Sequence, residues 1–152
     1  MEIKYSIRQM QKEDLEEVTA LEGSCFSMPW KYQDFEEVLS NPNRVYLVAH
    51  LEKESKVIGG CMLTHIAGEG DISNVAVDAG YRGNHIASDL LKELLDYGKT
   101  KWNISAFTLE VRSQNTAAIK LYENAGFESV GIRPNFYDKP KDDALIMWKK
   151  DV

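Results

Sequence analysis

The sequence contains few cysteines and no long hydrophobic run. Its 152 residues include two cysteines, Cys25 and Cys61, which we expect to be reduced thiols. Neither they nor the three histidines have metal-ligand spacing, so no metal site is predicted. The first residues carry charges throughout, which excludes a signal peptide or a membrane span. We therefore expect a cytoplasmic protein that does not bind membranes.

Basic residues are outnumbered by acidic ones. The chain has 18 Lys and Arg against 24 Asp and Glu, a formal charge of −6. Nucleic-acid binding depends mostly on neutralising phosphates, so this balance argues against a nucleic-acid partner and is compatible with a basic peptide substrate. The dinucleotide fingerprint, the P-loop and a nucleophilic triad are also missing.

The composition is that of a folded protein, with 43% hydrophobic and 28% charged residues. No repeat or low-complexity segment interrupts it, so we expect one domain over residues 1–152. The apolar periodicity predicts a mixed α/β (α+β) sheet of about seven strands covered by about four helices. The strands are expected at residues 3–8, 45–49, 57–64, 71–78, 106–112, 127–132 and 143–149, the helices at 12–26, 31–39, 88–98 and 115–124, and a loop at 134–140.

A strand, a tight turn and an amphipathic helix follow one another over residues 71–98. The first turn of a helix leaves about four N–H groups without intrahelical partners, and these attract phosphates. Residues 82–88 could therefore cradle a pyrophosphate. The alternative is an ordinary connection in which Gly83 serves only the turn geometry.

Glu110 lies in the middle of an expected central strand, where a carboxylate needs a partner, water or a catalytic role. Its alternative is an exposed or arginine-paired side chain. Tyr122 lies on the apolar stripe of the next helix, where an aromatic residue of the core is the simpler reading.

Together these motifs resemble the GNAT superfamily of acetyl-CoA-dependent N-acetyltransferases. The resemblance extends over essentially the whole chain and rests on residues 74–77, 81–87, 109–112, 115 and 118–127. It implies a mostly antiparallel sheet and acetyl-CoA as cosubstrate. It also implies that Glu110 is the general base and Tyr122 the general acid.

The resemblance further implies the cofactor-binding residues. These are Val75, Ala76 and Val77 for the pantetheine arm, Arg82, Gly83, Asn84, His85, Ile86, Ala87 and Ser88 for the pyrophosphate, and Asn115. His85 departs from the pattern, because related loops usually have Gly at this position. The turn must therefore either adopt a conformation open to L-residues or carry strain.

Residues 26–30, 133–137 and 143–147 look like those of a narrower group, which acetylates the N-terminal alanine of the eighteenth small-subunit ribosomal protein. This likeness implies the N-terminus of that protein as substrate, with Phe26, Trp30, Asn135 and Tyr137 as candidates for the peptide-binding wall. Loop packing is the alternative role for these four residues. Acetylation of a lysine, a polyamine or another small amine, and a non-catalytic acyl-CoA-binding module, are the other functions considered.

Overall fold

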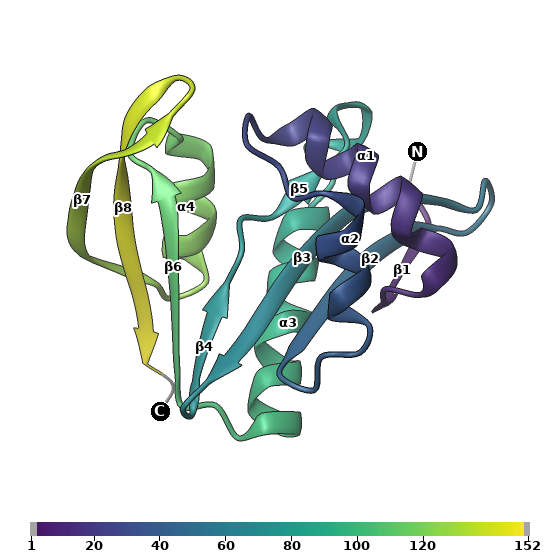
Figure 1. Cartoon of the computed structure of the whole chain (residues 1–152), viewed down its shortest axis with the longest axis horizontal. Helices are drawn as coiled ribbons and strands as arrows, with labels where there is room; N and C mark the ends of the chain where they lie inside the picture. Colours follow the sequence, from purple (N-terminus) through teal and green to yellow (C-terminus); the bar gives the residue numbers. More distant parts are fainter. Residues whose placement is uncertain (1–2, 151–152) are drawn as a thin grey trace.

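The protein is described by a computed structural model over residues 3–150, and one eight-stranded sheet organises it (Figure 1). The strand order is β1-β2-β3-β4-β6-β8-β7, and the short β5 pairs with β3. Among the strands of residues 3–150, only the β4–β6 pair is parallel, which confirms the mostly antiparallel sheet. The strands are β1 (Tyr5–Gln9), β2 (Arg44–Leu51), β3 (Lys56–Ile66), β4 (Glu69–Ile72), β5 (Ala76–Val77), β6 (Ala106–Arg112), β7 (Glu128–Asp138) and β8 (Lys141–Lys150).

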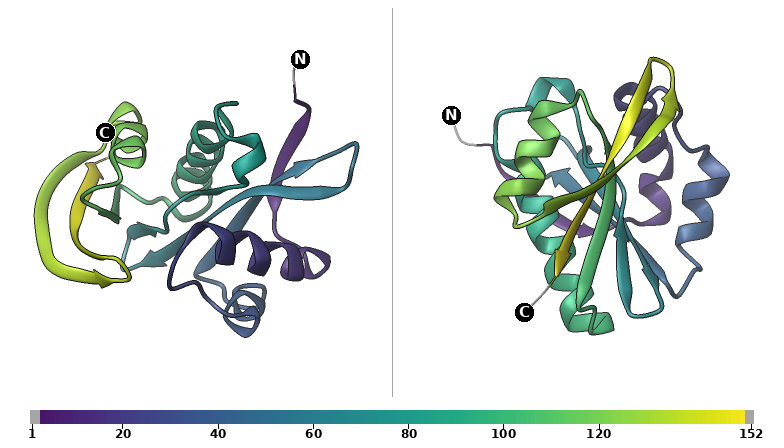
Figure 2. Two further views of the ribbon diagram at one scale, coloured as in Figure 1. Left: turned by 90° about the horizontal axis from the view of Figure 1, so that it is seen from above. Right: turned by 90° about the vertical axis from the view of Figure 1, so that its left-hand side faces the viewer.

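Helices cover both faces of this sheet (Figure 2). On one face lie α1 (Leu15–Cys25) and α2 (Tyr32–Val38), and on the other lie α3 (Ile86–Trp102) and α4 (Thr116–Asn124). Strand β2 serves both cores because its side chains alternate: Leu47 packs in the core that includes α3, whereas Tyr46 packs in the core beneath α1 and α2. The result is the expected mixed sheet covered by helices, in three layers.

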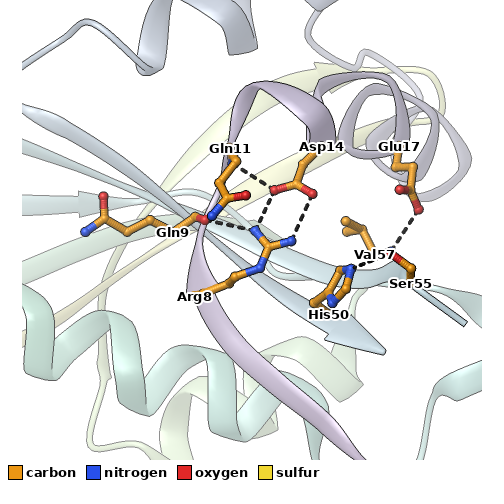
Figure 3. A network of polar contacts seen from close by, with 8 residues as sticks. All are labelled: Arg8, Gln9, Gln11, Asp14, Glu17, His50, Ser55 and Val57. Atoms are coloured by element: carbon orange, nitrogen blue, oxygen red, sulfur yellow. Dashed lines mark hydrogen bonds and ion pairs between the residues drawn. The ribbon is translucent and has the colours of Figure 1, made fainter. Parts of the chain in front are cut away.

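The start of α1 is held by a polar network (Figure 3). Arg8 of β1 donates from Nη1 and Nη2 to the Asp14 carboxylate at 2.6 and 3.1 Å, and the Gln11 N–H donates to the same carboxylate at 2.8 Å. Burial favours the neutral form of Asp14, but these hydrogen bonds outweigh it and lower the pKa. Glu17 also accepts the Val57 N–H at 2.9 Å, which ties the helix to β3.

The expected single strand over residues 71–78 is wrong, because the chain leaves the sheet between Ile72 and Ala76 and forms β4 and β5 instead. The pairing of β4 with β6 ends at Ile72 and Leu109. Beyond it, among the described strands, β5 pairs only with β3, and β6 continues only with β8. The two halves of the sheet therefore diverge at this point. Asn74 spans the divergence, since its Nδ2 donates to the Glu110 carbonyl at 2.6 Å.

The loop expected at residues 134–140 is also wrong, because most of it belongs to the long β7–β8 hairpin. Its prolines indicated a loop, but Pro134 lies in an irregular stretch of β7 between Arg133 and Tyr137, where a missing N–H breaks no regular ladder. Strand β7 is the last strand of the sheet, so it tolerates this interruption.

Candidate active site

A cavity of about 590 Å³ opens beside the divergence of β4 and β6. Its wall comes from segments far apart in the sequence: the end of α1 and residues 26–30, the end of β4, the C-terminal end of β6, and the β7–β8 hairpin. The charged residues of this wall are Glu22, Asp71, Glu110, Arg112 and Lys139.

Glu110 faces this cavity, as its place on the expected strand indicated. Alternation along β6 buries Phe107, Leu109 and Val111 and leaves the Glu110 side chain 33% exposed. Its Oε2 atom lies 2.6 Å from Arg133 Nε. The contact is an ion pair by distance, but its angles are not those of a hydrogen bond, so this buried oxygen has no aligned donor among the described residues. The carboxylate thus has an arginine partner by distance, and its buried Oε2 keeps unused acceptor capacity.

Tyr122 is almost fully buried, at 1% exposure, and packs edge-on against Phe127. Its hydroxyl accepts the Val75 N–H at 3.3 Å, on the segment that joins β4 to β5. Burial raises the pKa of this phenol, so it stays protonated at neutral pH. Tyr122 is not part of the cavity wall. Its ring is part of the core, and its hydroxyl is held at the divergence by Val75.

The predicted cofactor segments flank the same divergence. One edge of β5 pairs with β3, and the other edge has no strand partner among the described elements. The first turn of α3 has no side-chain cap, and the N–H groups of residues 83–88 have no acceptor in the described part of the chain. An extended ligand with an anionic group fits both features, by pairing with β5 and by binding the helix terminus.

Three predicted cofactor residues use their side chains locally. Arg82 turns back to β5, where its Nε donates to the Val77 carbonyl at 3.1 Å. Asn84 Nδ2 donates to the Tyr81 carbonyl at 2.9 Å. Asn115 lines the cavity and caps α4, because its Oδ1 accepts the Ala118 N–H at 3.1 Å. The anion-binding capacity of the turn therefore lies mainly in its backbone.

His85 adopts the left-handed conformation, with φ 63° and ψ 13°. Of the two conformations that the sequence allowed for this turn, the structure has the strained one, since an L-residue is disfavoured in this region relative to glycine. The strain sits directly before Ile86, at the N-terminus of α3.

Of the four residues expected to form the peptide wall, Phe26, Trp30 and Tyr137 line the cavity. Asn135 does not: it has φ 54° within β7, its N–H donates to Asp143 Oδ1 at 2.8 Å, and Phe136 lines the cavity instead. The description of Tyr137 as a loop residue is also wrong, because it belongs to β7.

Arg112, which was not among the expected site residues, joins opposite sides of the cavity. It donates to the Lys139 and Pro140 carbonyls of the hairpin at 3.1 and 2.6 Å and to Ser27 Oγ at 3.1 Å. Its guanidinium carbon also lies 4.3 Å from the centre of the Tyr137 ring. Its outward position on β6 was visible in the sequence, but its partners depend on the tertiary fold.

Residues 3–150 contain no group of three or more His, Cys, Asp or Glu side chains placed to hold a metal ion. None of the helices in this range has the length and apolar character needed to cross a membrane. Cys25 and Cys61 are free thiols, as expected.

Comparisons with known proteins agree with this architecture. The model of the acetyltransferase (GNAT) family matches residues 15–127. A Bacillus subtilis (strain 168) protein, named as a candidate ribosomal protein bS18-alanine N-acetyltransferase, is 36% identical over 149 residues, with 97% of each chain covered. The ribosomal protein bS18-alanine N-acetyltransferase of Escherichia coli (strain K12) is 31% identical, with 93% of this chain and 95% of that protein covered.

The crystal structure of the ribosomal-protein-S18-alanine N-acetyltransferase from Escherichia coli superposes with a TM-score of 0.85 at 27% identity, covering 97% of this chain and 94% of the other. The family match spans most of the chain, and the superposition covers nearly the whole of both folds. This chain therefore belongs to the GNAT family of acetyltransferases.

Proposed function

We propose that this protein transfers acetyl from acetyl-CoA to the α-amine of a protein N-terminus, and that its substrate is the N-terminal alanine of ribosomal protein bS18. Two relatives of nearly full coverage carry that substrate in their names. The observation that supports the chemistry is that two consecutive residues at the divergence, Asn74 and Val75, hydrogen-bond to Glu110 and Tyr122. The Glu110 carbonyl is bound by Asn74, and the Tyr122 hydroxyl by Val75. Action on a ribosomal protein places the enzyme in the cytoplasm.

Acetyl-CoA fits the unpaired features of the chain. The free edge of β5 and the segment around Val75 suit the amide groups of the pantetheine arm, and the uncapped first turn of α3 suits the pyrophosphate. Asn115, at the cavity wall, is a further contact in this assignment. When bound there, acetyl-CoA supplies the thioester that is to be aminolysed.

An N-terminal amine makes modest demands on the enzyme. With a pKa near 7.7 to 8, about 10 to 20% of α-amines are neutral at pH 7, whereas a lysine near 10.4 is neutral in only about 0.04% of molecules. A single carboxylate is therefore a sufficient base. Glu110 accepts the proton of the attacking amine, directly or through water. Tyr122, which burial keeps protonated, donates to the departing thiolate.

The test compares initial rates on three acceptors: a basic peptide that starts with alanine, the same peptide acetylated at its N-terminus, and spermidine. We expect turnover of the first alone. Equal rates on the blocked peptide would indicate lysine acetylation, and preferred turnover of spermidine would indicate a small-amine acetyltransferase. Binding of CoA without any product would indicate a non-catalytic module.

A further inference from the structure

Glu22 is a buried carboxylate that the chemistry above does not use. It lies in the last turn of α1, is 8% exposed, and still forms part of the cavity wall. Glu16 lies on the same helix but on its exposed surface, so these two glutamates of α1 differ in their surroundings. A buried carboxylate costs stability unless it is paired.

One oxygen of Glu22 has a fixed partner. Tyr46 donates its hydroxyl to Oε2 at 2.6 Å, and Tyr46 is itself 2% exposed. The hydroxyl packs against Gly60, where an added Cβ would lie 2.3 Å from it. Gly60 is the β3 residue that pairs with Ala76 of β5. Glu22 is thus held in one orientation by a tyrosine that rests on the backbone beside the proposed cofactor strand.

The other oxygen has no such partner. Among the described residues, the carboxylate makes no ion pair and no further hydrogen bond. Of the two cations in the wall, Arg112 and Lys139, the guanidinium of Arg112 donates to the hairpin carbonyls and to Ser27, and neither cation forms an ion pair with Glu22 among the described residues. Burial raises the pKa of Glu22 to about 7, although the hydrogen bond from Tyr46 acts to lower the pKa. The other titratable or charged groups around it are Cys25, Cys61, Asp71, Glu110, Arg112, Tyr137 and Lys139.

We propose that Glu22 binds the α-ammonium group of the incoming N-terminus, through the carboxylate oxygen that Tyr46 leaves free. This inference rests on the proposed function and adds to it a residue that recognises the unblocked terminus. The ammonium reaches Glu22 on the α1 side of the cavity, with Glu110 on the β6 side as the proton acceptor. An N-terminus without a positive charge loses the ionic part of this contact.

The test is a binding measurement that needs no turnover. Dissociation constants are measured by calorimetry at pH 7.5 with saturating CoA, for an alanine-starting peptide and for the same peptide with its α-amine replaced by hydrogen. A charged hydrogen bond is worth about 1.5–3 kcal/mol, so we expect the wild type to favour the amine at least about tenfold. In Glu22→Gln, whose amide oxygen still accepts from Tyr46, the preference should fall close to one. The matched control Glu16→Gln should keep it.

A preference that persists in a folded Glu22→Gln variant, or its absence from the wild type, overturns the inference. If Glu22→Gln does not fold, Glu22→Asp withdraws the carboxylate from the cavity and is measured in the same way. An undiminished preference there also overturns it. Failure of the proposed function shows separately, as no acetylation of the amine peptide by the wild type, because the binding ratio does not depend on catalysis.

Discussion

Replacing Glu22 by glutamine should change how the stability of the protein depends on pH. The carboxyl has a pKa of about 7 in the folded protein and 4.5 ordinarily, because burial disfavours its charged form. The folded state therefore holds this proton more tightly than the unfolded state does. The contribution of Glu22 to stability is full below pH 4.5, declines as the pH rises toward 7, and is lost above it.

The magnitude follows from the interval between the two pKa values. About 2.5 pH units at 1.36 kcal/mol each give about 3 kcal/mol. Glutamine keeps the acceptor for Tyr46 and carries no titrating proton. The free energy of unfolding of Glu22→Gln minus that of the wild type should thus grow by about 3 kcal/mol between pH 4.5 and 8. For a chain of this size, the Tm of Glu22→Gln minus that of the wild type should therefore be about 6–12 °C larger at pH 8 than at pH 4.5.

The assay is urea denaturation at half-unit pH intervals without CoA, on the wild type, Glu22→Gln and Glu16→Gln. The exposed Glu16→Gln control should give a curve parallel to the wild type. A Glu22→Gln curve that also stays parallel, within about 1 kcal/mol over the whole range, would refute the reasoning. It would mean that the cavity hydrates this carboxylate as well as bulk water does. If Glu22→Gln is more stable at pH 8 but no longer distinguishes the amine peptide, the buried Glu22 charge is kept for recognition at a cost in stability.

Three further outcomes follow from the site. Glu110→Gln should lower kcat about 10²–10⁴-fold while the Kd of acetyl-CoA, measured by calorimetry, stays unchanged; an unaltered kcat would contradict the role of Glu110 as base. Tyr122→Phe removes the hydroxyl that meets the Val75 N–H and should slow single-turnover acetyl transfer, whereas a lowered Tm with a normal rate would leave Tyr122 as a core aromatic alone. His85→Gly should raise the free energy of unfolding by about 0.5–1 kcal/mol, because glycine relieves the φ of 63° and this gain exceeds the added freedom of the unfolded chain. His85→Ala should give no such gain in the same denaturation assay, and an equal gain from both would show that the left-handed backbone is not the cause.

The sequence predicted well wherever the signal is local. The alternation of Phe107, Leu109 and Val111 placed Glu110 on the opposite side of β6 from these buried residues, and the turn at residues 82–88 indicated the start of a helix. It failed where a distant partner overrides local preference. Residues 73–75 leave the sheet although their neighbours favour a strand, and Pro134 sits inside a long edge strand although prolines indicate a loop.

Periodicity and motifs in the sequence therefore determined the mixed, helix-covered sheet and the candidates Glu110 and Tyr122. Only the tertiary structure decided what those groups face. Asn74 reaches Glu110 across 36 residues, Arg112 joins β6 to the hairpin and the loop after α1, and Tyr46 turns Glu22 into a fixed acceptor in the cavity. Burial, pairing and charge environment arise from contacts between segments far apart in the chain, so no local pattern of residue types can carry them.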